Sequence, residues 1–460
     1  MPPAASQIKI LIVGAGIAGL TLAILLERAN IAYEILERHQ THTPLGSAIC
    51  LIPSVQPLLQ QLGLLDEIKR RSKPFGAMVF REENLEIIGT YSSRTPLDIQ
   101  ERYGEFPHII SRKDLCAILA DHVPQHKIRF GKRVLEIRQN TGEVIVQCSD
   151  KSVYHADILV GADGAYSAVR QCLHNSLDAR GLLPKHDTAP VGYEYDCLVG
   201  VTDPMDPLVT PALSDTFSEF QTILSKDSSI AYWCIPLTEN RMSWMVVQHH
   251  DKGKKHAEET IFKQSDWGED AAELMGRQYR DLRTSYGYDL GYMMDRTPKE
   301  DTTKVMLEEK FYMTWYNGRV VLAGDACHKV VPFGGQGANQ SIHDVLTLAN
   351  LLVDLKDNTL EDIGSMFETY YKERAPVGRA IVHMSSWAGD LMNRKGWFND
   401  LVRKVALRHT PRWLAQLAND RMSYDRPQAA FLPFVDVGGT LQPRPQTRSE
   451  YIPFSEEQSC

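Results

Sequence analysis

The stretch that decides the fold is Ile8-Lys9-Ile10-Leu11-Ile12-Val13-Gly14-Ala15-Gly16-Ile17-Ala18-Gly19-Leu20, near the start of a 460-residue chain. Its first six residues are rich in Ile, Leu and Val, which is typical of a strand buried on both faces of a parallel sheet. The glycine turn that follows leads into a helix. Gly14 permits the sharp bend, Gly16 lets the backbone approach a pyrophosphate, and Gly19 brings the helix close to the sheet. The open N–H groups of that helix would face the phosphates.

An acid at the end of the next strand supports this interpretation. The apolar segment from Ala32 to Leu36 ends in Glu37, eighteen positions after Gly19. At that distance an acid can bind the hydroxyls of an adenosine ribose, so the glycine pattern and the acid together predict a dinucleotide site. The acid argues against a ribose with a 2′-phosphate, although Arg38 and His39 weaken that inference.

Composition, net charge and cysteine content limit the classes of protein to which the chain can belong. The chain is 43% hydrophobic and 23% charged, and its length allows two to three domains or one large composite core. A net charge of −8 argues against a nucleic-acid partner. The eight cysteines include no CxxC pair and no His/Cys ligand spacing, so we expect no metal site and a reducing, cytoplasmic location. No signal peptide and no stretch of ~18 apolar residues is found, so we expect a soluble protein without a transmembrane segment.

Two further strand-to-helix turns follow the pattern of the first. One lies in the stretch 157–170, where a buried strand runs into Gly-Ala-Asp-Gly with the acid at Asp163. The other ends the strand at 318–323, and Asp325 then sits where a doubly wound sheet places its ligand. A glycine-dense loop at 332–337 precedes the next helix and suits an electron-rich group. For the turn within 157–170, the alternative is an ordinary α/β connection.

Two stretches between these turns are open to more than one interpretation. The loop 43–51, which contains Gly46 and Cys50, suits a segment lying against a flat ligand and equally suits a crossover into the next helix. The sequence Ser111-Arg112-Lys113-Asp114 has the form of a capping box. Arg112 would therefore stand in the first turn of a helix, where it either reaches a phosphate or ribityl oxygen or is simply solvated.

The pattern of predicted secondary structure changes after residue 190. Strands expected at 191–201, 217–224, 230–235 and 242–249 follow one another without helices, which predicts an antiparallel sheet. Aromatic residues gather there; we expect most to pack the core and a few to line an apolar pocket. Helices are expected at 269–286 and from 359 to 419. An apolar stripe within 397–406 would pack on the body or lie on a membrane surface.

Together, three motifs in this order resemble the class A FAD-dependent monooxygenases, which are aromatic-hydroxylase-like flavoproteins with a glutathione-reductase-type Rossmann fold. The motifs are Gly14-x-Gly16-x-x-Gly19 with Glu37; Asp163-Gly164-x-x-Ser167-x-x-Arg170; and Gly324-Asp325-Ala326-x-His328 with Pro332 and the glycines of 334–337. The resemblance spans roughly residues 8 to 380. Within the family the chain is most similar to fungal members associated with secondary metabolism, such as salicylate hydroxylase-like and terpenoid-epoxidising enzymes.

The resemblance implies a domain organisation and a set of site residues. It implies an α/β fold with an FAD-binding Rossmann domain at 1–174 and 311–360, an inserted antiparallel-sheet substrate domain at 175–310, and C-terminal helices with an irregular tail at 361–460. Glu37 would hold the adenosine ribose, Arg112 and Asp325 the ribityl and pyrophosphate part, and Gly337 with Ala338 the isoalloxazine edge. The implied FAD contacts are Gly14, Gly16, Gly19, Glu37, Arg38, Gly46, Cys50, Arg112, Asp163, Asp325, Gly337 and Ala338. The implied substrate pocket comprises Tyr193, Tyr195, Trp233, Pro332 and Phe333.

The resemblance also implies a reaction. NADPH or NADH would reduce the flavin, O2 would add at C4a, and the resulting hydroperoxide would hydroxylate or epoxidise a small aromatic or apolar metabolite. No catalytic side chain is named, because several fungal relatives place an Arg in the first strand of the substrate sheet, where this chain reads Tyr193-Glu194-Tyr195-Asp196-Cys197. Two alternatives stay open: a flavin-dependent reductase or dehydrogenase of the geranylgeranyl reductase type, and a non-catalytic binding protein on the same scaffold, as the GDP-dissociation inhibitors are.

Overall fold

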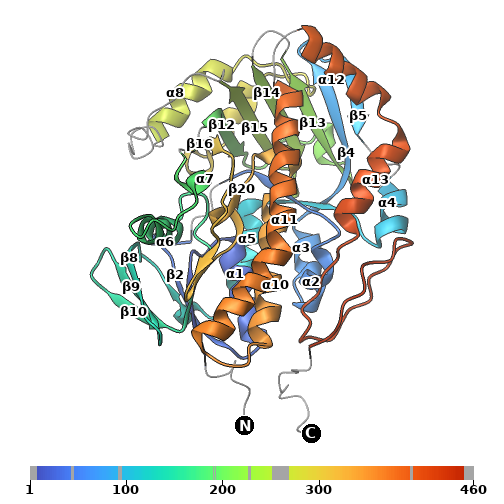
Figure 1. The fold of residues 1–460 in the computed structure, drawn as a ribbon. Coiled ribbons are helices and arrows are strands. Elements are labelled where there is room, and N and C mark those ends of the chain that lie inside the picture. Colours follow the sequence, from blue (N-terminus) through green and yellow to red (C-terminus); the bar gives the residue numbers. More distant parts are fainter. Residues whose placement is uncertain are drawn as a thin grey trace.

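The computed structural model describes residues 8–42, 46–91, 96–189, 191, 193–225, 229–250, 269–393 and 397–449. Two large sheets organise the molecule, with helices packed on them (Figure 1). The helices of the first half are α1 (Ile17–Arg28), α2 (Gln56–Gln61), α3 (Leu65–Arg70), α4 (Pro96–Tyr103), α5 (Arg112–Asp121), α6 (Ala168–Asp178) and α7 (Lys185–Thr188). Those of the second half are α8 (Glu269–Tyr279), α9 (Leu290–Met294), α10 (Gly337–Val353), α11 (Leu360–Asn393), α12 (Trp397–His409) and α13 (Arg412–Ser423).

The six-stranded sheet carries the first glycine turn. Its strand order is β18 (Tyr316–Asn317), β19 (Val320–Leu322), β11 (Ile158–Gly161), β1 (Lys9–Val13), β2 (Ala32–Leu36) and β7 (Ile128–Arg129). β1 pairs in parallel with both β2 and β11, and β11 pairs in parallel with β19. The predicted buried parallel strands are therefore confirmed. Because parallel strands end at one edge, this topology brings the three strand-to-helix turns together.

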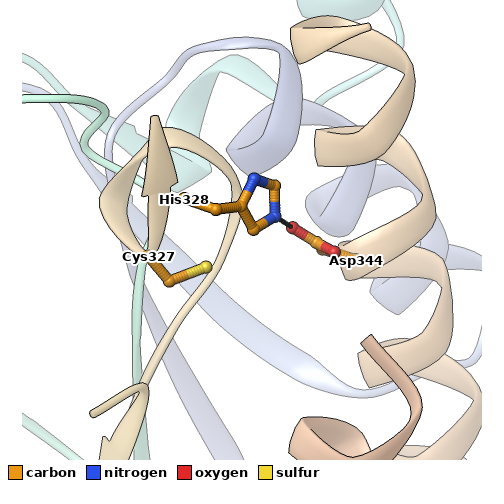
Figure 2. Close-up of side chains that lie close together, drawn as sticks. All are labelled: Cys327, His328 and Asp344. Atoms are coloured by element: carbon orange, nitrogen blue, oxygen red, sulfur yellow. Dashed lines mark hydrogen bonds and ion pairs between the residues drawn. The ribbon is translucent and has the colours of Figure 1, made fainter. Parts of the chain in front are cut away.

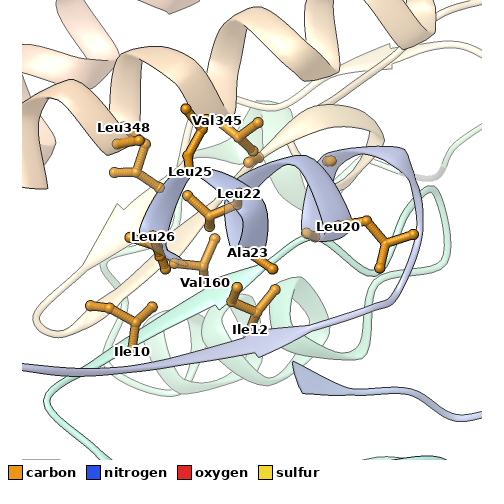
Figure 3. Packing of buried hydrophobic residues seen from close by; sticks show 14 of the residues in the cluster. Ile10, Ile12, Leu20, Leu22, Ala23, Leu25, Leu26, Val160, Val345 and Leu348 are labelled. Atoms are coloured by element: carbon orange, nitrogen blue, oxygen red, sulfur yellow. The ribbon is translucent and has the colours of Figure 1, made fainter. Parts of the chain in front are cut away.

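The core of this half lies between the sheet and two helices. α1 is buried along most of its length, with Leu22 and Leu25 facing Val345 and Leu348 of α10 (Figure 3). On its other side, α1 covers Ile10, Ile12 and Val160 of the sheet (Figure 3). α1 is thus held between the sheet and α10, which fixes the position of its N-terminus.

The nine-stranded sheet forms the upper part of the view in Figure 1. Its order is β16 (Thr303–Glu308), β12 (Tyr193–Val201), β15 (Met242–His249), β14 (Ile230–Pro236), β13 (Ser218–Leu224), β4 (Lys73–Glu82), β6 (His108–Ser111) and β3 (Ala48–Leu51), with β5 (Ile87–Tyr91) paired to β4. The expected strands after residue 190 pair antiparallel, and β13 pairs in parallel with β4. Strands β3 to β6 come from within 1–174, so both parts of the chain build this sheet. Division of the chain at 174, 310 and 360 stays a prediction.

Two small sheets complete the fold. One contains β8 (Val134–Gln139), β9 (Val144–Cys148) and β10 (Val153–Ala156), and the other pairs β17 (Lys310–Phe311) with β20 (His328–Lys329). The C-terminal region is helical, as expected, through α11, α12 and α13. None of the helices in the described part of the chain combines the length and the hydropathy that a membrane span requires.

Candidate cofactor and substrate site

The three glycines of the first turn meet different surroundings. Gly14 has a φ of 104°, and a Cβ there would lie 2.5 Å from the carbonyl oxygen of Ala162. A Cβ on Gly19 would lie 1.9 Å from the carbonyl oxygen of Gly14. A Cβ on Gly16, the N-cap residue of α1, would meet no protein atom within 4 Å. The fold itself therefore requires Gly14 and Gly19, whereas open space lies beside Gly16 at a helix N-terminus suited to an anion.

The Glu37 carboxylate is fixed beside this turn. Its two oxygens accept hydrogen bonds from the backbone N–H groups of Ala15 and His39, each 2.9 Å long. The neighbouring Arg38 is exposed, and its Nε donates to the His39 ring at 3.2 Å. Glu37 thus lies at the first turn, as predicted. Arg38 hydrogen-bonds the adjacent side chain, and its contact with a cofactor stays a prediction.

The second turn packs against the first and is held by its own hydrogen bonds. Asp163 Oδ1 accepts from the Ser167 hydroxyl at 2.5 Å, and Oδ2 accepts from the backbone N–H of Ala168 at 2.7 Å. Burial raises the pKa of Asp163, and these hydrogen bonds oppose that shift. The Arg170 guanidinium donates to the Ala326 carbonyl at 3.0 Å and so ties the second turn to the third. A cofactor contact by Asp163 stays a prediction, because its oxygens already brace α6.

The third turn lies between α1 and α10. A Cβ on Gly324 would lie 3.6 Å from Ala18 Cβ and 2.7 Å from Ser341 Oγ. Asp325 is half-buried, and its carboxylate makes no recorded hydrogen bond or ion pair with the residues that the structure describes. A Cβ on Gly337, the first residue of α10, would lie 3.9 Å from Asp325 Oδ1. An acid and a helix N-terminus therefore stand side by side here.

Arg112 occupies the first turn of α5, as the capping box predicts. The Ser111 hydroxyl accepts from the Asp114 backbone N–H at 3.0 Å, and the Arg112 N–H donates to the Ser47 carbonyl at 2.9 Å. Gly46 has a φ of 130°, and a Cβ there would lie 2.8 Å from Arg112 Cδ. The Arg112 guanidinium is half-buried and has no recorded hydrogen bond or ion pair within the described ranges. Such a cation favours binding of an anion.

One buried amide joins this loop to α10. Asn339 is fully buried, and its Nδ2 donates to the Cys50 carbonyl at 2.9 Å and to the Gly335 carbonyl at 3.1 Å. Burial raises the pKa of the Cys50 thiol to about 12, so the thiol stays protonated. Cys50 therefore contacts α10 through its backbone carbonyl. Sequence reasoning missed Asn339, although a polar residue on the apolar side of a helix is a usable signal.

A network of buried charged side chains holds the third turn in place. Asp344, on α10, accepts from His328 Nε2 at 2.6 Å (Figure 2). The same oxygen accepts from the Gly324 backbone N–H at 3.0 Å. Its other oxygen accepts from Arg374 Nε at 2.8 Å. His328 and Arg374 hold the pKa of Asp344 down, to about 2, although burial alone would raise it. Sequence reasoning missed this network.

The network brings together groups of metal-ligand type. Ligand atoms of Cys327, His328 and Asp344 lie within 4.8 Å of one another (Figure 2). However, Arg374 already compensates the carboxylate charge, and burial raises the pKa of the Cys327 thiol well above its usual range. The thiol also donates to the Gly324 carbonyl at 3.2 Å. The arrangement is that of a structural ion pair bracing the turn.

The aromatic residues expected at a substrate pocket come together on the large sheet. The Phe333 ring lies 5.2 Å from the Tyr195 ring and 6.0 Å from the Trp233 ring, between ring centroids. Tyr195 and Trp233 are buried, whereas Pro332 and Phe333 are half-buried in the loop before α10. Tyr193 begins β12, and its side chain lies outside the described part of the structure. The loop of the third turn thus contacts the nine-stranded sheet.

Comparison with known proteins decides the family. A family model described as an FAD binding domain matches residues 7–385. The chain belongs to the class A FAD-dependent monooxygenases. This monooxygenase is 28% identical to the FAD-dependent monooxygenase esdpE of Penicillium shearii, covering 88% of this chain and 83% of that one. It is 29% identical to ptmM of Penicillium ochrochloron, covering 90% and 96%.

Solved structures share the fold of the monooxygenase. Klebsiella pneumoniae HpxO complexed with FAD and uric acid superposes with a TM-score of 0.70 at 20% identity, covering 91% of this chain and 97% of that one. The fold is therefore the mixed α/β fold of this class. FAD is the cofactor, as the family resemblance implied. The open space at Gly16 fits such a group, and so does the Arg112 guanidinium, which has no hydrogen bond or ion pair with the described residues.

Proposed function

We propose that this monooxygenase uses NAD(P)H and O2 to hydroxylate or epoxidise a small aromatic or apolar metabolite. When bound, FAD supplies the redox chemistry, and the protein supplies binding, orientation and exclusion of water. The observation that carries the proposal is the meeting of two surfaces at the third turn. The N-terminal turns of α1 and α10 adjoin one side of it, and Phe333 contacts the aromatic rings of the large sheet on the other.

We propose the following division of roles along the cofactor. Glu37, fixed by the Ala15 N–H, would bind the adenosine ribose, and the N-terminus of α1 at Gly16 would bind the pyrophosphate. Arg112 and Asp325 would bind the ribityl and phosphate region. The six-stranded sheet is then the glutathione-reductase-type FAD-binding unit. Further contacts are proposed at Gly14, Gly19, Arg38, Gly46, Cys50 and Asp163.

The N-terminus of α10 would act on the flavin ring. The first N–H groups of a helix have no partner within the helix, and the helix dipole places positive potential there. At Gly337 and Ala338 this potential would stabilise negative charge on the reduced ring without any titratable side chain. Asp344 is a positioning residue, because its bond to the Gly324 N–H holds the turn that aligns α10.

The substrate would lie against the aromatic residues at the same turn. Tyr195, Trp233, Pro332 and Phe333 offer ring faces and apolar edges, which bind apolar or aromatic molecules by burial and stacking. Tyr193 is proposed as a further member from its place on β12. Because Phe333 precedes α10 by only four positions, a molecule held there would sit next to the proposed flavin position.

The test is turnover of the FAD-loaded enzyme under ¹⁸O2 with NADPH or NADH and a panel of aromatic and polyene substrates. We expect oxidation of the nicotinamide and a product that carries one ¹⁸O atom. Phe333→Ala should raise KM, whereas Leu208→Ala, at an exposed position in the connection that follows β12, serves as a control. An oxygen-independent product with two added hydrogens would instead identify a reductase.

A further inference from the structure

Helix α12 is attached to the body mainly through charged side chains. Arg403 is buried and donates to the Leu391 carbonyl at 3.0 Å, and Lys404 pairs with Glu82 at 2.6 Å. Leu407 is the apolar residue that packs inward, against the β4–β5 region. The opposite side of the helix exposes Leu401 (52%), Val402 (40%) and Val405 (51%).

Helix α13 repeats this arrangement. Asp420 accepts two hydrogen bonds from Arg102, at 2.6 and 2.5 Å, and one from the Tyr103 hydroxyl at 2.9 Å. Asn419 accepts from the Tyr91 hydroxyl at 2.6 Å. The outward side exposes Trp413 (67%), Leu414 (44%) and Leu417 (54%).

Both helices therefore reverse the usual pattern. A surface helix of a globular protein normally buries its apolar stripe and exposes its charges. Here the exposed apolar residues recur at the helical spacings of three and four, so they form a stripe on each helix. The two helices are consecutive in the chain and lie along one edge of the molecule (Figure 1). An exposed apolar surface of this kind marks an interaction site. We call these six residues the α12–α13 face.

The charge of the region identifies what covers this face. Helices α12 and α13 contain five Lys and Arg against two Asp, in a chain whose net charge is −8, and Arg408 and Arg421 among them are exposed. A basic helix pair with Trp and Leu on its outer side fits the boundary between the headgroups and acyl chains of an anionic bilayer. A second copy of the chain would place one basic region against another, since a two-fold contact uses the same patch twice.

We propose that the α12–α13 face docks this monooxygenase on the surface of an anionic lipid bilayer. Leu401, Val402, Val405, Trp413, Leu414 and Leu417 would enter the interface, while the exposed Arg408 and Arg421 contact lipid headgroups. The association is peripheral. It does not rest on the proposed oxygenation, because binding to vesicles is measured without turnover.

The test is flotation of the full-length, FAD-loaded enzyme with phosphatidylcholine vesicles, with and without phosphatidylserine. We expect binding to the phosphatidylserine vesicles that weakens with added salt. The triple variant Leu401→Gln, Val405→Gln, Leu417→Gln should lower the partition coefficient by roughly tenfold per side chain. The matched control Leu135→Gln, Val153→Gln removes exposed apolar residues from the small sheet and should leave binding unchanged.

Three results would overturn the proposal. The wild-type enzyme could stay unbound on every vesicle, or the triple variant could bind as the wild type does. Light scattering could also show a dimer that the triple variant dissociates, which would assign the face to a second copy. Unchanged flavin content and melting temperature of the triple variant establish that any loss of binding comes from the surface.

Discussion

Replacement of Gly16 by alanine separates the needs of the cofactor from those of the fold. Gly16 has φ −87° and ψ −172°, a conformation that alanine adopts freely, and the added Cβ would meet no protein atom within 4 Å. Alanine caps the start of a helix less well than glycine, by roughly 0.5 to 1.5 kcal/mol. It also stabilises by about 0.4 to 1 kcal/mol through the unfolded state. The free energy of unfolding of the apoprotein should therefore change by less than about 1 kcal/mol.

FAD affinity should respond far more strongly to Gly16→Ala. The methyl group would occupy the space proposed for the pyrophosphate and displace it from the N–H groups of α1. A hydrogen bond to a charged group is worth about 1.5 to 3 kcal/mol, so losing one raises the Kd about 10- to 100-fold. Titration of the apoprotein with FAD, followed by flavin fluorescence, measures this change. Gly364→Ala, where a Cβ also meets no atom within 4 Å, is the matched control.

Two outcomes would refute this reasoning. The Gly16→Ala protein could bind FAD with the wild-type Kd, or its apoprotein could unfold at much lower denaturant. A contrasting variant sharpens the comparison. Gly19→Ala would place a Cβ 1.9 Å from the Gly14 carbonyl oxygen, so it should destabilise the apoprotein itself.

Three further predictions concern single side chains. Arg112→Ala should raise the Kd for FAD about 10- to 100-fold with little change in unfolding free energy, and an unchanged Kd in the same titration would contradict its role. Asp344→Asn leaves Arg374 without its carboxylate and should cost about 3 to 5 kcal/mol in urea unfolding; wild-type stability would contradict this. Burial lowers the pKa of His108 to about 4 from 6.5. Between those pH values only the unfolded chain binds the proton, so stability should fall by roughly 3 kcal/mol as the pH drops. His108→Gln should flatten this dependence in urea unfolding, and an unchanged slope would contradict it.

The features that sequence predicted are those set by neighbouring residues. The sharp bend at Gly14, the close approach at Gly19 and the cap at Ser111 each depend on a few consecutive residues. The same holds for the position of Glu37, since two parallel strands that share an edge place it beside the first turn. The spacing of nearby residues was therefore enough to predict the positions of these residues in the candidate cofactor site.

The features that sequence did not predict depend on contacts between distant segments. Strand β4 joins the large sheet through pairing with β13, about 140 residues later, and no local pattern encodes that partner. The bond between Asp344 and Arg374 forms only when α10 and α11 pack together. In α12, helical periodicity located an apolar stripe, but the side that faces the body is set by Arg403 and its partner on α11.

The most direct test of the central claim is the electron density of FAD in crystals of the holoenzyme. We predict the pyrophosphate at Gly16, the adenosine ribose at Glu37, the Arg112 guanidinium in contact with the cofactor, and the flavin ring at the N-terminus of α10. A cofactor that lies elsewhere and leaves Glu37 and Arg112 without contact would contradict the account.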